Sequence, residues 1–164
     1  MLIDFNIQKN DGTFLAGNDL LKDPKSYREE LLALNYVGGS ITIATDETVW
    51  DIEDELAPLL YHFCLLSLPR LVQDGKYRFN YFEIHGIVDL ESADGFVLIS
   101  GSFIETILVV RDEFIPQALQ CVLRYIDFFQ KLNEPKFNND WKLLAQTADE
   151  MVNYLQENYP EYIK

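Results

Sequence analysis

One stretch of the chain places side chains that could do chemistry at alternate positions. Glu83 and His85 are followed by Asp89 and Glu91, and in an extended strand residues separated by an even number of positions point to the same face. Imidazole and carboxylate groups on one face are typical of divalent-metal ligands and of a general acid and base. Such a site also needs groups from other segments, and none is evident. A small metal-dependent or hydrolytic enzyme built on Glu83, His85 and Asp89 is therefore kept as an alternative.

Other catalytic signatures are missing from the sequence. Ser100-Gly101-Ser102 lacks the G-x-S-x-G frame of a nucleophile elbow, and Gly38-Gly39 belongs to no dinucleotide or phosphate-loop pattern. Cys64 and Cys121 are far apart in the chain and each lies in an apolar helical pattern, which favours buried free thiols over a disulfide. We therefore predict no catalytic residue, no cofactor and no metal, and a protein that is not an enzyme.

The distribution of charge is the most informative feature of the sequence. The formal net charge is −14, and there is no Lys or Arg between Arg28 and Arg70 or between Arg78 and Arg111. Carboxylates are concentrated in these two windows, and the candidates for a contact surface are Asp51, Glu53, Asp54, Glu55, Glu83, Asp89, Glu91 and Asp94. If the two windows adjoin in space, these residues form one negative surface that would attract a basic protein. A solvated acidic face without a partner is the simpler alternative.

The amino-acid composition excludes several classes of protein. A hydrophobic content of 48% indicates a folded domain despite the high charge. The acidic excess argues against nucleic-acid binding, which needs a basic footprint. No apolar run approaches the roughly 18 residues needed to span a bilayer, and the first residues, 1–5, lack the basic and apolar regions of a signal peptide. We therefore expect a cytoplasmic protein with no membrane contact.

The segment from Tyr77 to Val110 predicts a meander of three strands. The apolar phase changes near Tyr81-Phe82, which suggests a β-bulge there, and residues 91–95 form a polar hairpin loop. Phe96 to Ser100 is the second strand, Gly101-Ser102 a two-residue turn, and Phe103 to Val110 the third strand. The last two strands are apolar on both faces: one side is predicted to hold Val97, Ile99, Ile104, Leu108 and Val110, and the other Phe96, Leu98, Phe103, Ile107 and Val109. We therefore expect both faces to be covered, by helices or in part by a second copy.

The other elements follow from periodicity. Strands are predicted at residues 3–7, 13–16 and 40–45. Residues 27–33 fit a short helix, although 31–37 also fits a strand. Long helices are predicted at about 51–73, 112–132 and 139–157, the first with Asp51 to Glu55 in its opening turns, where the helix dipole favours anions.

Together these patterns predict one α+β domain over residues 1–164, with a mainly antiparallel sheet centred on residues 77–110 and three main helices. The function they favour is that of an acidic immunity or inhibitor protein that neutralises a basic partner, such as a nuclease toxin. The second alternative, after the small enzyme, is a self-assembling subunit that forms a homodimer.

Overall fold

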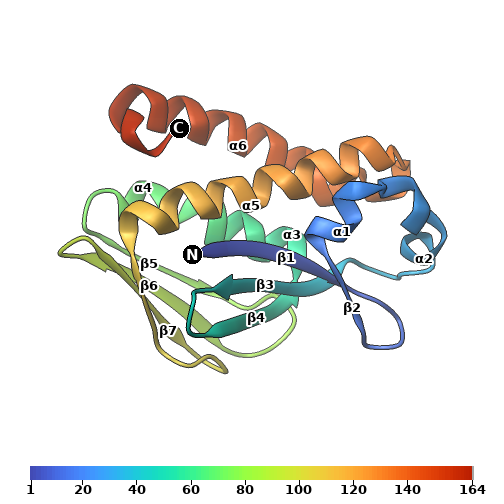
Figure 1. Ribbon diagram of the computed structural model, residues 1–164, viewed down its shortest axis with the longest axis horizontal. Coiled ribbons are helices and arrows are strands. Elements are labelled where there is room, and N and C mark those ends of the chain that lie inside the picture. The colour runs from blue at the N-terminus through green and yellow to red at the C-terminus, as the bar shows by residue number, and fades with distance from the viewer. Residues whose placement is uncertain (164) are drawn as a thin grey trace.

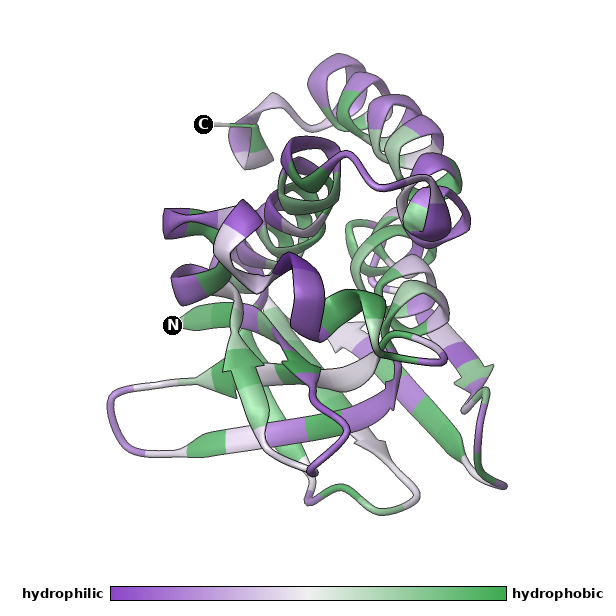
Figure 2. Cartoon of the chain, turned by 90° about the vertical axis from the view of Figure 1, so that its right-hand side faces the viewer, coloured by the Kyte–Doolittle hydropathy of each residue, from purple (hydrophilic) through white to green (hydrophobic). Residues whose placement is uncertain are grey.

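The computed structural model describes residues 1–163 and contains two four-stranded antiparallel sheets with helices packed along one side of them (Figures 1 and 2). The first sheet has the order β2-β1-β3-β4, and its strands are β1 Leu2–Gln8, β2 Phe14–Ala16, β3 Gly38–Ala44 and β4 Val49–Glu55. Alternate β1 side chains, Ile3, Phe5 and Ile7, are fully buried. One face of this sheet therefore belongs to the core, as period-two patterning requires.

The second sheet is a simple meander. Its strands follow each other in space in chain order, β5 Lys76–Asn80, β6 Ile87–Ala93, β7 Phe96–Gly101 and β8 Ile107–Val110. Val97 and Ile99 of β7 are fully buried on the inner face.

The helices form the remaining layer. They are α1 Gly17–Lys22, η1 Pro24–Tyr27, α2 Arg28–Leu32, α3 Leu56–Leu60, η2 Tyr61–Leu66, α4 Leu68–Leu71, α5 Arg111–Leu132, η3 Pro135–Phe137, α6 Asn138–Asn158 and η4 Pro160–Tyr162. The long helix α5 packs on β1, on η2 and on β7 and β8, and α6 packs on α5 (Figure 1). Helix α5 thus joins the cores of both sheets, and its Phe114, Tyr125 and Phe129 are buried there.

The predicted α+β class is confirmed, as are the helices at 112–132 and 139–157. The helix at 27–33 is also confirmed, as η1 and α2, and the alternative strand at 31–37 is wrong.

The helix predicted from Asp51 is wrong at its start. Residues 49–55 form strand β4, paired to β3, and helical structure begins only at Leu56. Within β4, Ile52 and Asp54 are buried and alternate with exposed or half-exposed acidic residues. That is strand periodicity, but the run of acidic residues also matched the first turns of a helix.

The meander was predicted with one strand too few. Residues 81–86 are a loop between β5 and β6 and not a bulge, β6 extends to Ala93, and β8 begins only at Ile107. The connection from β7 to β8 is longer than the predicted two-residue turn at Gly101-Ser102. The predicted third strand, which is β8, therefore turns the opposite set of alternate side chains toward the core. Ile107 and Val109 face inward, whereas Leu108 and Val110 had been assigned to the face of Val97 and Ile99.

The prediction that helices cover both faces of these strands is also wrong. On the outer face Phe96, Leu98, Leu108 and Val110 are exposed. Coverage of this face by a second copy stays an untested alternative. Among residues 1–163 no helix is long and apolar enough to cross a membrane.

Candidate partner-binding site

The two sheets meet where β4 lies beside the 81–86 loop. The Asp54 carboxylate accepts hydrogen bonds from the backbone N–H groups of Phe82 (2.7 Å) and Glu83 (3.0 Å). Asp54 is only 6% exposed, so its charge is used internally to hold the loop against β4. It was predicted as a contact residue, and the structure gives it a supporting place beneath the surface instead.

A second loop, residues 102–106, is fixed to the first. The Tyr81 hydroxyl donates to the Ser102 carbonyl oxygen (2.9 Å), and the Ser102 hydroxyl oxygen accepts from the Ile87 N–H (3.2 Å). The chain of hydrogen bonds from β4 through both loops therefore gives this region a defined shape.

Four predicted carboxylates come together here. Asp51, Glu53 and Glu55 occupy alternate positions of β4, on the face opposite Asp54, and Glu83 lies on the adjoining loop. Two small hollows, of about 150 and 210 Å³, share Glu53 and Ile84 in their linings. Within residues 1–163, Glu53, Glu55 and Glu83 form no ion pair, and Asp51 accepts a hydrogen bond from Thr42.

Apolar side chains project among these carboxylates. Phe82 is 67%, Ile84 47% and Phe103 76% exposed. Phe103 also has a φ of 65°, a left-handed conformation that costs a bulky residue free energy and is concentrated at functional positions. We call the surface formed by Asp51, Glu53, Glu55, Glu83, Phe82, Ile84 and Phe103 the acidic junction.

The other three predicted carboxylates lie elsewhere. Asp89 on β6 is bound by Arg78 through two hydrogen bonds, of 2.6 and 2.9 Å, which lower the pKa of Asp89. Glu91 pairs with Lys76 at 2.9 Å, and Asp94 occupies the β6–β7 turn. These carboxylates are not part of the acidic junction.

The predicted row of Glu83, His85, Asp89 and Glu91 on one strand face does not exist. Glu83 and His85 lie in the 81–86 loop, whereas Asp89 and Glu91 lie on β6 and are neutralised by basic neighbours. In the described part of the chain no group of three His, Cys, Asp or Glu residues is placed to hold a metal ion.

A larger pocket adjoins the acidic junction. It has a volume of about 380 Å³ and is lined by apolar side chains together with Glu55 and Asp140, and Phe82 forms part of its wall. Asp140 lies in the first turn of α6. Sequence reasoning missed it, because an acidic residue at a helix start is ordinary. We call this cavity the Glu55–Asp140 pocket.

Both carboxyl groups of this pocket are perturbed. Burial raises the pKa of Asp140 to about 6, against a small opposing effect of Lys136. Burial also raises the pKa of Glu55, with further contributions from the negative charges of Glu83, Asp140 and Asp54. Nearby, the pKa of Tyr36 is raised, chiefly through the hydrogen-bonding interaction of its hydroxyl with Glu83. The acidic junction and its pocket therefore carry negative charge that the protein does not neutralise.

Asp140→Asn should stabilise the protein at neutral pH. The folded-state pKa of Asp140, about 6, is above its usual 3.8, so the folded state binds more protons and stability falls as pH rises from about 4 to 6. The shift corresponds to at most about 3 kcal/mol. Solvent screening of this half-buried group roughly halves that figure, and the lost helix-dipole interaction takes away about 0.5 kcal/mol. We expect a net gain of about 1 kcal/mol at pH 7 from chemical denaturation.

The same denaturation series, repeated from pH 4 to 7, provides the control. The difference between wild type and Asp140→Asn should grow with pH across this window. A variant that is less stable than wild type at pH 7 would show that the Asp140 charge is compensated in the folded protein.

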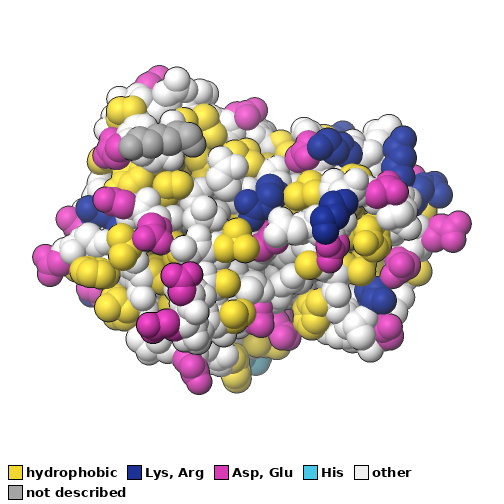
Figure 3. Space-filling model, in the orientation of Figure 1, with side chains coloured by type: hydrophobic (Ala, Val, Ile, Leu, Met, Phe, Trp, Pro, Cys, Tyr) yellow, Lys and Arg dark blue, Asp and Glu magenta, His cyan; other side chains and the backbone are white. Residues whose placement is uncertain are grey.

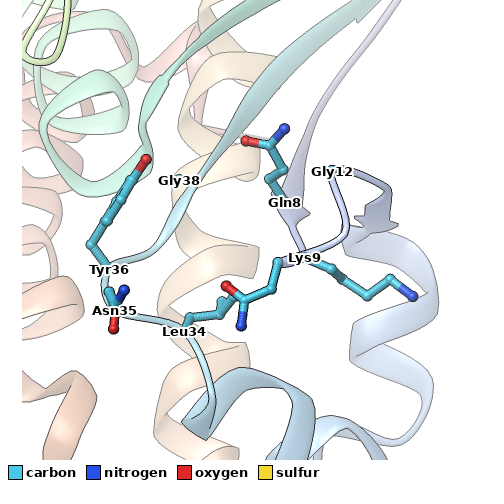
Figure 4. A pocket seen from close by; sticks show the side chains of 8 residues that line it. Gln8, Lys9, Gly12, Leu34, Asn35, Tyr36 and Gly38 are labelled. Carbon is cyan, nitrogen blue, oxygen red and sulfur yellow. The ribbon is translucent and has the colours of Figure 1, made fainter.

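A separate cavity, of about 240 Å³, is polar and lies between the β1–β2 turn and the segment before β3 (Figure 4). Its one basic residue, Lys9, points away from Tyr36 in this view and pairs with Asp11 and Glu30. No carboxylate lines this cavity, and we assign it no role.

Basic residues are concentrated away from the acidic junction. On the face shown in Figure 3, most Lys and Arg side chains lie on the half of the molecule that holds α1 and α2. The acidic junction is built from the two windows, 29–69 and 79–110, that contain no Lys or Arg.

Comparison with protein-family models, with curated proteins and with solved structures finds no match to this chain.

Proposed function

We propose that this chain is a non-enzymatic binding protein that neutralises a basic protein partner by docking the acidic junction onto it. In its most concrete form it is an immunity or inhibitor protein for a nuclease toxin. The observation that carries the proposal is that unpaired carboxylates surround the exposed Phe82, Ile84 and Phe103 on loops held by hydrogen bonds.

This combination suits recognition of a basic protein. Exposed aromatic side chains supply most of the affinity in many interfaces, because they fill pockets on the partner and lose little conformational entropy. Carboxylates around them attract a basic partner and exclude acidic ones. A nuclease presents positive charge to the phosphates of its substrate, so an acidic surface with apolar anchors could occupy its active site.

The fixed loops support the same proposal. Asp54 and the Tyr81–Ser102 contact hold both loops before any partner arrives. A preformed surface pays less ordering entropy on binding.

The proposal is tested by affinity capture from a native lysate at low salt, with wild type and a Glu53→Lys/Glu83→Lys variant as baits. We expect wild type to retain one basic protein stoichiometrically and the variant to lose it, because two attractive charges become repulsive. The matched control is Asp149→Lys/Glu157→Lys, which makes the same charge change on exposed positions of α6. Equal loss with both variants would indicate an effect of net charge alone, and retention by the Glu53→Lys/Glu83→Lys variant would contradict the proposal.

A further inference from the structure

The Glu55–Asp140 pocket combines apolar walls with two carboxyl groups. It lies where the end of β4, the helices α3 and η2 and the first turn of α6 converge, and its apolar lining includes Pro58, Tyr61 and Leu143. Tyr61 comes from η2, a π-helix, and such wide turns occur frequently at functional sites.

No cation of the described chain neutralises this pocket. Within residues 1–163 neither Glu55 nor Asp140 forms an ion pair. Lys136, whose charge slightly opposes the raised pKa of Asp140, donates instead to the carbonyl oxygens of Leu32 (2.6 Å) and Leu34 (2.5 Å). Its ammonium group is therefore engaged with the backbone at the end of α2.

His62 lines the pocket but does not supply the charge. Its Nδ1 lies 2.7 Å from the Tyr77 hydroxyl oxygen, and its ring stacks on Phe79 with 5.2 Å between centroids. Burial lowers the pKa of His62, so the imidazole is neutral at pH 7.

A buried hydroxyl that feels the charge of both carboxyls has no hydrogen-bond partner among residues 1–163. The Tyr125 hydroxyl is fully buried, and among the described residues it has no hydrogen-bond partner. Burial raises the pKa of Tyr125, and the charges of Asp140 and Glu55 raise it further, so the hydroxyl lies within the field of both carboxylates. Buried polar groups without partners are rare in folded proteins and call for an explanation.

We infer that the Glu55–Asp140 pocket binds a guanidinium group on an aliphatic stem, the side chain of an arginine of the partner. The two carboxylates would hold the guanidinium, which is planar, always charged and weakly hydrated. The apolar walls would contact the stem, and Tyr61 and Phe82 offer aromatic surface to the cation. The inference rests on the proposed function, since Glu55 and Phe82 belong to both the pocket and the acidic junction.

Butylguanidinium chloride tests this inference without the partner. We expect titration into the isotope-labelled protein at pH 7.5 to shift amide NMR signals of residues 55–62 and 139–144, with a Kd of about 1 mM for so small a ligand. Butylurea, which has a similar shape and no charge, should not bind. Asp140→Asn should weaken binding at least about tenfold, whereas Glu157→Gln on exposed α6 should not change it.

The pH dependence adds a second criterion. Because the pKa of Asp140 is about 6, most of this carboxyl is protonated at pH 5, and binding should weaken there. The loss between pH 7.5 and pH 5 should be larger in wild type than in Asp140→Asn, which keeps only the titration of Glu55. Equal binding of butylguanidinium and butylurea, or unchanged binding by Asp140→Asn, would overturn the inference.

The two proposals fail in different ways. If butylguanidinium does not bind but charge reversal of Glu53 and Glu83 still abolishes capture of a basic protein, the pocket inference falls and the proposed function stands. If butylguanidinium binds but no basic protein is captured, the pocket binds the cation without serving the proposed function.

Discussion

Replacing Asp54 by alanine should lower the free energy of unfolding by about 2–4 kcal/mol, because the N–H groups of Phe82 and Glu83 lose their acceptor in a partly buried place. The same change should release the 81–86 loop from β4. We expect a lower denaturation midpoint in urea and faster hydrogen exchange of these two amides than in wild type.

Asp46→Ala is the matched control for Asp54→Ala. Asp46 is an exposed carboxylate between β3 and β4, and its removal should change the free energy of unfolding by less than about 0.5 kcal/mol. If Asp54→Ala were as mild as Asp46→Ala, Asp54 would not be what joins the two sheets.

Phe103→Gly should weaken binding of the basic partner by about 30-fold, which corresponds to about 2 kcal/mol and is typical of a central aromatic residue in an interface. Stability should stay within about 1 kcal/mol of wild type. Phe103 is 76% exposed, and glycine adopts its φ of 65° without steric cost. Binding measured by calorimetry and unfolding measured in urea separate the two effects.

Phe96→Ala provides the comparison for Phe103→Gly. Phe96 is a phenylalanine 45% exposed on β7, outside the acidic junction, and its removal should change affinity less than twofold. Equal losses for Phe96→Ala and Phe103→Gly would extend the partner contact to the outer face of the second sheet and would contradict a contact centred on the acidic junction.

Several features of the fold were predictable from local patterns. The helices α5 and α6 have long single apolar stripes with turn residues after them, and the strands β1 and β3 show clear alternation. The strand β4 was read as a helix, because acidic residues before an apolar run suit either a helix start or an edge strand with one wet face. Pairing with β3 decides between the two, and this is tertiary information.

The candidate site was predictable only in part. The lack of Lys and Arg in two windows indicated that Asp51, Glu53, Glu55 and Glu83 belong to a negative surface, and the structure brings these four together at the acidic junction. Residues 81–86 were predicted to be part of a strand, but they form a loop. Asp89 and Glu91 were therefore wrongly placed on the same strand face as Glu83 and His85. Asp140 gave no local signal, since its burial depends on contacts of α6 with α3 and η2.

The measurement that tests the central claim most directly is the association rate constant with the captured partner as a function of salt. For wild type the rate should fall steeply as ionic strength rises, because screening weakens the attraction of the acidic junction. For Glu53→Lys/Glu83→Lys the rate should be low and nearly independent of salt, and for Asp149→Lys/Glu157→Lys it should follow wild type closely. A Glu53→Lys/Glu83→Lys variant that associates as fast as wild type, with the same salt dependence, would contradict the account.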